Sequence, residues 1–212
     1  MRFIALIIFF TLCTFFGLVK IYSNKPFTLN SSELIASKKE HIPMIDFTKQ
    51  NLSQLGLLEP QDIESWRITN DGVMGGQSQG SFSLQASHAL FAGHISLENN
   101  GGFSSVFRSI KSLNKGFEKV SINIKGDGLT YQLRMSVKLD GYRLAYKHNF
   151  TTVAGQQKQL TFLLADFQAS FRGRNIPNAP VLLSENILEV GFLVSSKVAG
   201  AFSLAISSVD FK

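Results

Sequence analysis

Residues 130–150 read TYQLRMSVKLDGYRLAYKHNF, and this stretch decides the fold. Apolar side chains occupy every second position of its first half, which is the period of a β-strand with one buried face. Asp140-Gly141 follows, a dipeptide typical of two-residue hairpin turns. The stretch therefore predicts an antiparallel hairpin. Its apolar face pairs Leu139 with Tyr142, Val137 with Leu144, and Met135 with Tyr146.

The polar face of this hairpin carries like charges opposite each other. Such pairs destabilise neighbouring strands, so they need a reason. One explanation is an anionic or strongly polar partner over this face. The other is a solvated face whose charge is offset by nearby Asp127 or Glu118. The predicted register gives two such pairs: Lys138 with Arg143, and Arg134 with Lys147.

Seven further short apolar runs lie between residues 82 and 211, separated by turn signals and without sustained helical periodicity. Many short strands at this spacing predict an all-β fold, a β-sandwich or jelly roll. The composition agrees, because Phe is frequent at 19 residues and Pro is sparse at 5. Aromatic and branched side chains suit the core of such a fold.

Residues 66–78, WRITNDGVMGGQS, have the features of an ordered loop. Glycine pairs weaken a strand and Asn-Asp-Gly breaks a helix, so neither regular element suits this run. A second glycine-rich segment, NNGGF at 99–103, has the same character. In a sandwich such loops gather at the sheet ends, where glycine lets the backbone approach a ligand or another loop.

Two explanations of these loops stay open. In the first they build one polar site, with Trp66 as an aromatic wall. In the second they lock against each other while Trp66 fills the core. Neither loop has a phosphate-binding signature, so no dinucleotide cofactor is implied. The polar contacts expected in the first explanation are Asp71, Asn99, Asn100 and Arg108.

The two glycine-bearing segments resemble the signature segments of the complex I intermediate-associated protein 30 family. One departure is Phe107 before Arg108, where family members commonly have the arginine one residue sooner; this shift turns Arg108 to the other side of a strand. The resemblance runs from about residue 44 to 211. It is carried by WRITNDGVMGGQS, by FAGHISLENNGGFSSVFRS at 91–109, and by the shorter matches KGDG at 125–128 with Tyr131, FRGR at 171–174 and GAFSL at 200–204.

The resemblance implies a galactose-binding-domain-like jelly-roll β-sandwich over residues 44–212. It also implies a chaperone-like, non-catalytic role, since mitochondrial members are associated with assembly of respiratory complex I. The loops, the hairpin and the resemblance together predict a binding site. Its residues are Trp66, Asn70, Asp71, Gly75, Gly76, Ser78, Asn99, Asn100, Gly101, Gly102, Arg108, Arg134, Lys147 and Arg172.

The N-terminal region differs from this domain in composition. Residues 3–19, FIALIIFFTLCTFFGLV, carry no charge, and Arg2 and Lys20 flank them. This length is at the lower limit for a bilayer span, so we interpret 1–20 as a hydrophobic signal-anchor helix; a cleaved signal or a buried core helix are the alternatives. Residues 21–43 are a polar tether. We expect a membrane-anchored domain on the exported side, although the lysines after residue 19 favour the opposite orientation.

The sequence lacks the signals that are typical of several classes of function. The only cysteine, Cys13, lies in the apolar segment, so the domain has no disulfide, thiolate metal site or cysteine nucleophile. The four histidines share no ligand spacing and no catalytic motif is present, so we expect no metal, no cofactor and no catalysis. Residues 104–158 hold ten Lys or Arg against three acids, which indicates a charged face rather than a nucleic-acid-binding arm.

Three functions remain. The preferred one is a membrane-tethered module that binds a protein partner in a membrane complex and assists its assembly. The second is a carbohydrate-binding module, favoured by Trp66, Tyr142, Tyr146 and the Asn-rich loops, which requires an exposed aromatic ring. The third is a hydrolase of glycans or esters, which requires two carboxylates or a nucleophile and base in one cleft. The available carboxylates are Glu64, Asp71, Glu98 and Asp127.

Overall fold

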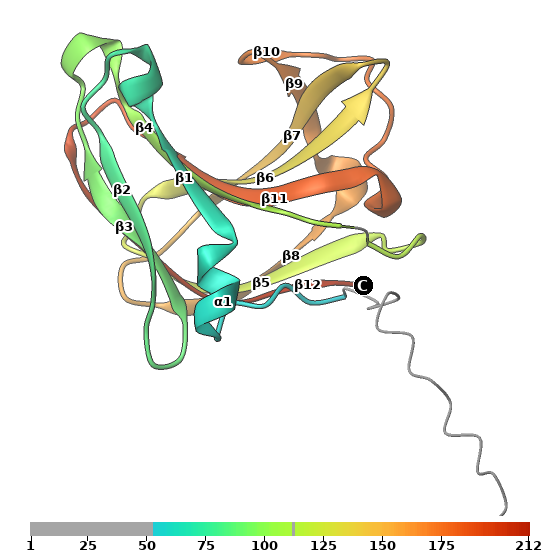
Figure 1. Cartoon of the computed structure of the whole chain (residues 1–212), viewed down its shortest axis with the longest axis horizontal. Helices are drawn as coiled ribbons and strands as arrows, with labels where there is room; N and C mark the ends of the chain where they lie inside the picture. The colour runs from blue at the N-terminus through green and yellow to red at the C-terminus, as the bar shows by residue number, and fades with distance from the viewer. Residues whose placement is uncertain (1–52, 112) are drawn as a thin grey trace, which may run out of the picture. The chain divides into compact units, whose positions relative to one another are not determined.

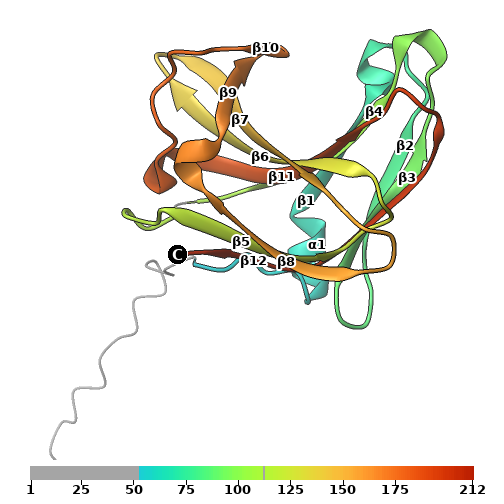
Figure 2. The same ribbon diagram turned by 180° about the vertical axis from the view of Figure 1, so that it is seen from behind.

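The computed structural model describes residues 53–111 and 113–212. Within them the chain forms twelve strands in two antiparallel sheets, packed face to face as an all-β sandwich (Figure 1, and from behind in Figure 2). The predicted N-terminal helix and the tether at 21–43 lie outside the described residues. No helix in the described part is long and apolar enough to span a membrane.

One sheet has seven strands and curves so that the face turned away from the other sheet is concave (Figure 1). We call this side the outer face. The strand order is β1 (Trp66–Asn70), β4 (Phe103–Ser109), β11 (Ile187–Ser195), β6 (Thr130–Leu139), β7 (Tyr142–Thr151), β9 (Gln168–Phe171) and β10 (Arg174–Asn175).

The other sheet has five strands and lies on the convex side of the first (Figure 1). Its central strand, β12, is formed by the last residues of the chain. The strand order is β2 (Gln79–Leu84), β3 (Ala89–Ile95), β12 (Gly200–Phe211), β5 (Lys119–Lys125) and β8 (Gln157–Leu163).

Helices in the described part are short and join the strands. The α-helix α1 (Pro60–Glu64) precedes β1 and has proline in its first turn, a position where the missing amide is not needed. The 3₁₀ turns are η1 (Asp71–Met74), η2 (Glu98–Asn100), η3 (Leu164–Asp166) and η4 (Ser184–Asn186).

The predicted hairpin is confirmed with its register. Strands β6 and β7 have the bounds expected from the alternation, and Leu139 lies opposite Tyr142. The like-charge pairs are also present, with Lys138 opposite Arg143 and Arg134 opposite Lys147. The apolar positions of both strands face the five-stranded sheet, which leaves the charged positions on the outer face.

The prediction that residues 66–78 form a loop throughout is wrong for its first part. Trp66–Asn70 is strand β1, paired with β4. Trp66 and Ile68 alternate toward the core, and the first glycine comes only at Gly72, after the strand has ended. The breaking residues therefore end β1 instead of preventing it.

Candidate functional site

The two glycine-rich loops meet at the carboxylate of Asp71, which is 0% exposed. Its Oδ1 accepts a hydrogen bond from the Ser78 amide at 2.9 Å, and its Oδ2 accepts one from the Ser78 hydroxyl at 2.5 Å. Oδ2 also accepts bonds from the amides of Gly102 at 2.6 Å and Phe103 at 3.2 Å. One buried carboxylate thus joins segments 31 residues apart, and we call this arrangement the Asp71 lock.

The lock keeps its carboxylate ionised. Burial alone would raise the pKa of Asp71, because it disfavours the charged form. The hydrogen bonds from Ser78, Gly102 and Phe103 stabilise that form more, and they hold the pKa of Asp71 below its ordinary value. The ionised carboxylate therefore accepts the hydrogen bonds that hold the two loops together.

Neighbouring groups of the two loops reinforce the lock. The Asn99 side chain donates to the Gly75 carbonyl at 2.9 Å. Gly76 and Gly101 lie so close to Asp71 that an added Cβ would sit 2.4 Å and 2.6 Å from its carboxylate atoms. Glycine is therefore needed at both positions for loop-to-loop contact, which corresponds to the second explanation of these loops.

The remaining polar residues predicted for the loops lie around this lock. Asn70 accepts a hydrogen bond from the Ser104 hydroxyl at 2.7 Å. The Ser78 hydroxyl oxygen accepts a bond from the Ser96 amide at 3.0 Å. Asn100 is exposed, with a left-handed backbone at φ 59°. Ligand binding by these loops stays a prediction, since their contacts in the structure hold one another.

Trp66 lies in the core between the sheets. It is 6% exposed, and its ring centroid lies 5.0 Å from that of Phe82 and 6.4 Å from that of Phe192. The ring presents no surface on which a ligand could stack. The aromatic wall expected of Trp66 is therefore absent, and the carbohydrate-binding alternative loses that support.

Arg108 does not join the loops. It lies opposite Trp66 on the core-facing side of β4, whereas Asn70, which leads into the first loop, lies opposite Ser104 at the other end of that strand. Its Nη1 donates to the Gly56 carbonyl at 2.6 Å and lies 3.4 Å from Asp62 Oδ1. Arg108 thus fastens the segment before β1 to the sheet.

Arg172 is also separated from the loops in the strand order of the sheet. It lies in the turn between β9 and β10, at the opposite edge of the seven-stranded sheet from β1. Its guanidinium carbon is 5.4 Å from the centroid of the Phe171 ring. The predicted site residues therefore separate into the loops, the core-facing side of β1 and β4, the outer face and this turn.

The outer face contains a row of directly opposed residues that crosses six strands. Gly191 makes room in this row, because a Cβ there would lie 2.3 Å from the ring of Phe107. The aromatic ring consequently packs over the glycine and stays partly exposed. The row, from β1 to β9, is Arg67, Phe107, Gly191, Arg134, Lys147 and Gln168.

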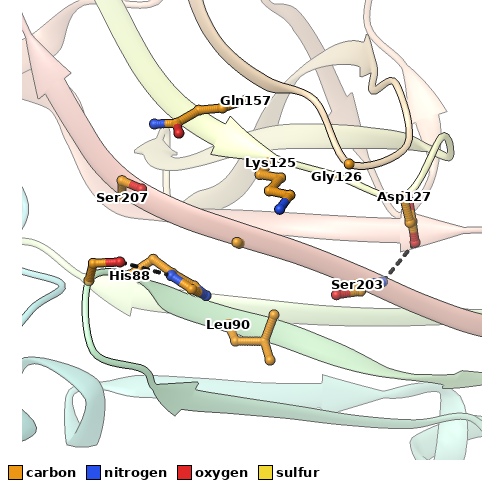
Figure 3. Close-up of a pocket in the computed structure, with 11 residues that line it drawn as sticks. His88, Leu90, Lys125, Gly126, Asp127, Gln157, Ser203 and Ser207 are labelled. Atoms are coloured by element: carbon orange, nitrogen blue, oxygen red, sulfur yellow. Dashed lines mark hydrogen bonds between the residues drawn. The ribbon is translucent and has the colours of Figure 1, made fainter.

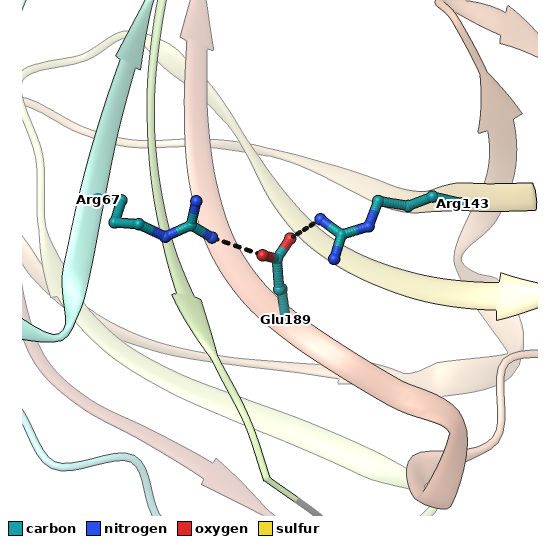
Figure 4. A network of polar contacts seen from close by, with 3 residues as sticks. All are labelled: Arg67, Arg143 and Glu189. Carbon is teal, nitrogen blue, oxygen red and sulfur yellow. Dashed lines mark hydrogen bonds and ion pairs between the residues drawn. The ribbon is translucent and has the colours of Figure 1, made fainter.

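Glu189 on β11 lies between two arginines of this face (Figure 4). Its Oε1 accepts a bond from Arg67 at 2.6 Å and its Oε2 one from Arg143 at 2.9 Å. The Glu189 side chain is 8% exposed, whereas the arginine side chains are 61% and 59% exposed. Glu189, and not the expected Asp127 or Glu118, therefore offsets part of the hairpin's charge.

Arg134 lies in the middle of the row. Its Nε is buried and has no hydrogen-bond partner among the described residues, and burial lowers the pKa of its guanidinium. An unpaired buried donor costs free energy, and here the cost falls in the middle of the row. The cations of the outer face are Arg67, Arg134, Lys138, Arg143 and Lys147, against Glu189 as the carboxylate of its described strands.

Sequence reasoning found Arg134 and Lys147 but missed Arg67, Phe107 and Glu189. The signal for Phe107 was its insertion before Arg108, which places the aromatic ring on the outer face. Glu189 lies in an otherwise apolar strand, and its pairing with two distant arginines becomes visible only with the strand order.

A separate hollow of about 810 Å³ lies over the five-stranded sheet (Figure 3). His88, Lys125 and Gln157 are among its lining residues. Asp127 also lines it, but accepts bonds from the Tyr131 hydroxyl at 2.9 Å and the amides of Ser203 at 2.7 Å and Leu129 at 3.0 Å. Asp127 thus has a structural role, and the described lining contains no second carboxylate for hydrolysis.

The contact with Asp127 also affects the pKa of Tyr131. Burial, followed by the adjacent Asp127 charge, raises the pKa of Tyr131 far above its ordinary value. The phenol therefore stays a neutral hydrogen-bond donor. Within residues 53–111 and 113–212, no group of three or more His, Cys, Asp or Glu is placed to hold a metal ion.

The fold is of a class found among carbohydrate-binding modules. The family 11 module from Clostridium thermocellum, in complex with a β-1,3-1,4-mixed-linked tetrasaccharide, has a TM-score of 0.55 and 14% identity, covering 74% of this chain and 94% of the module. The family 11 module of the cellulosomal cellulase Lic26A-Cel5E of Clostridium thermocellum has a TM-score of 0.51 and 13% identity, with coverages of 69% and 86%. These likenesses show the fold alone.

The sequence shows to which family the chain belongs. The model of Complex I intermediate-associated protein 30 (CIA30) matches residues 45–206, most of the chain. The chain therefore belongs to this family, as the glycine-bearing segments predicted. No curated protein sequence matches it.

Proposed function

We propose that this chain is a non-catalytic, jelly-roll binding module that binds a protein partner through the outer face and assists assembly of a membrane complex. Family membership supports a protein partner within a complex. The observation that carries the proposal is the row across the outer face, where partly exposed cations surround Arg134 and its unpaired donor. In this proposal residues 3–19 anchor the domain at a membrane and the domain lies on the exported side.

The charge of the outer face specifies the partner's chemistry. Five cations face one carboxylate that two of them already share, so a partner surface bearing Asp or Glu would be attracted to it. A carboxylate placed over the partly exposed guanidinium of Arg134 would also be attracted to its charge. The partner surface is therefore acidic and fits a concave sheet.

Removing charge from this face is expected to release the partner. In membranes solubilised with mild detergent, the chain carrying Arg134→Gln and Lys147→Glu should retain its partner at least about ten-fold less well than the unmodified chain. Quantitative co-purification followed by mass spectrometry measures the retained partner. The matched control is Lys119→Gln with Lys125→Glu, which makes the same change of charge at two exposed lysines of β5 in the other sheet.

The two possible negative results have different meanings. Equal loss in both double variants would show a general charge effect and place the binding surface elsewhere. A chain that purifies alone in its unmodified form would contradict the assembly role itself.

A glycan ligand is the second candidate, because Phe107 presents a partly exposed ring on the same face beside polar groups. Exposed aromatic rings with convergent polar groups are typical of sugar sites. Were this the function, titration calorimetry with mixed-linked β-glucan oligosaccharides would detect binding that Phe107→Ala reduces at least about ten-fold. Val198→Ala, at an exposed apolar residue outside the outer face, is the control. Absence of heat from a panel of neutral and acidic glycans would remove this candidate.

A further inference from the structure

The ends of two hairpins expose a cluster of apolar side chains at one edge of the seven-stranded sheet. The hairpin of β6 and β7 turns at 140–141, and that of β9 and β10 turns at 172–173; β7, β9 and β10 lie together in Figure 1. Tyr142 is 63% exposed and its ring meets that of Phe171 edge-on at 5.9 Å. With these rings, Leu139, Leu144 and Ile176 line a hollow of about 370 Å³.

The cluster is exposed because the sheet's apolar alternation continues to its end. Leu139 and Tyr142 occupy the core-facing register of β6 and β7, as do the buried Val137 and Leu144. At the tip of the hairpin, the described part of the chain leaves the side chains of this register partly exposed. An aromatic ring left in water at such a position indicates an external partner.

The charges around the cluster are mainly positive. Lys138 is exposed at the same hairpin end, and the exposed Arg172 and Arg174 flank Phe171. Arg143 is already paired with Glu189, so it adds little to this edge. The nearby acid is Asp140, in the first turn. We call the apolar cluster and its three cations the hairpin-tip patch.

We propose that the hairpin-tip patch docks on the surface of an anionic lipid bilayer. Tyrosine is enriched at the membrane–water interface because its ring is apolar and its hydroxyl polar. Lysine and arginine close to the ring are attracted to anionic headgroups within a Debye length of the surface. Two adjacent hairpins with aromatic, aliphatic and cationic side chains at their ends combine both requirements. An acidic protein surface is the alternative occupant, and the fluorescence experiment below distinguishes it from lipid.

This docking shares only Lys138 with the outer face and does not require the partner proposed for that face. The side chains of Tyr142 and Phe171 belong to the core-facing register and the turn, whereas the row through Arg134 faces the other way. Either proposal can therefore fail without the other.

Membrane depth at Tyr142 tests the proposal in the full chain. Cys13 is the only cysteine, so Cys13→Ser gives a background in which Tyr142→Cys carries a single environment-sensitive fluorophore. The chain is reconstituted in vesicles of phosphatidylcholine alone, or of equal parts phosphatidylcholine and phosphatidylglycerol, each with a lipid-borne quencher. We expect a blue shift and at least about two-fold stronger quenching in the anionic vesicles.

The matched control is a fluorophore at Val198→Cys. Val198 is also an exposed apolar residue, 74% exposed, but follows the other end of β11. Because both labelled chains keep residues 3–19, any anchoring by that segment is common to them. Only the label at position 142 is expected to respond to anionic lipid.

Neutralisation of two arginines tests the role of charge. In the chain labelled at position 142, the substitutions Arg172→Gln and Arg174→Gln should together lower the apparent affinity of the hairpin-tip patch for the anionic vesicles about thirty-fold. Equal quenching at 142 and 198 overturns the proposal, as does a response at 142 that is the same in both lipids. A blue shift without lipid quenching also overturns it, because it shows that protein covers the patch.

Discussion

Replacement of Asp71 by alanine is expected to lower the free energy of unfolding by about 4 kcal/mol. The substitution leaves buried donors of Ser78, Gly102 and Phe103 without their acceptor, and it releases the second loop from the first. Since a domain is stable by roughly 5–15 kcal/mol, this change removes a large part of the total. Chemical denaturation followed by circular dichroism measures it.

The control for this prediction is Asp166→Ala, at an exposed carboxylate in η3. We expect it to change the free energy of unfolding by less than about 0.5 kcal/mol. Equal losses from the two substitutions would contradict the structural importance of the Asp71 lock.

Acid should weaken the lock in a defined direction. The pKa of Asp71 is lower in the folded chain than in the unfolded one, so its ionisation contributes stability above the unfolded pKa. That contribution is lost as the pH falls through the folded pKa. The difference in unfolding free energy between the unmodified chain and Asp71→Asn should therefore be constant near neutral pH and narrow below about pH 4.

Replacement of Trp66 by alanine is expected to cost about 4 kcal/mol, because it empties a large buried volume between the sheets. The contacts with Phe82 and Phe192 are lost at the same time. Trp66→Phe, which keeps an aromatic ring there, should cost clearly less. Thermal unfolding and denaturant titration give both values.

Tyr142→Ala is the matched aromatic control, since that ring is 63% exposed. Its effect on unfolding should stay within about 0.5 kcal/mol. A mild effect of Trp66→Ala combined with loss of glycan binding would instead return Trp66 to the role of a ligand contact.

The sequence was most informative where one face of a strand is buried. Period-two alternation and Asp140-Gly141 determine the β6–β7 register, because a slip by one residue would move every apolar side chain of the strand into water. The meeting of the glycine-rich loops could also be expected, since loops gather at sheet ends. Their closed state could not, because spacing does not tell whether Asp71 accepts bonds from protein or from a ligand.

The outer face shows the limit of reasoning along a single chain. The row through Gly191 joins β1, β4, β11, β6, β7 and β9, whose order follows from pairing between distant segments. Arg67 carries no local pattern that marks it, and Phe107 is marked only by its insertion before Arg108. Strand β1 was missed for a related reason: five residues before a glycine-rich turn give too short an alternation to outweigh the turn signals.

The position of β12 has a consequence for synthesis. Because β12 supplies the middle of its sheet, pairing β3 on one side and β5 on the other, neither of those earlier strands has its inner neighbour until translation has passed residue 211. From the synthesis of β5 until that of β12, the nascent polypeptide therefore carries two open strand edges, a state prone to aggregation. Cellular holdases that bind such intermediates are consequently expected to act on this chain before it folds.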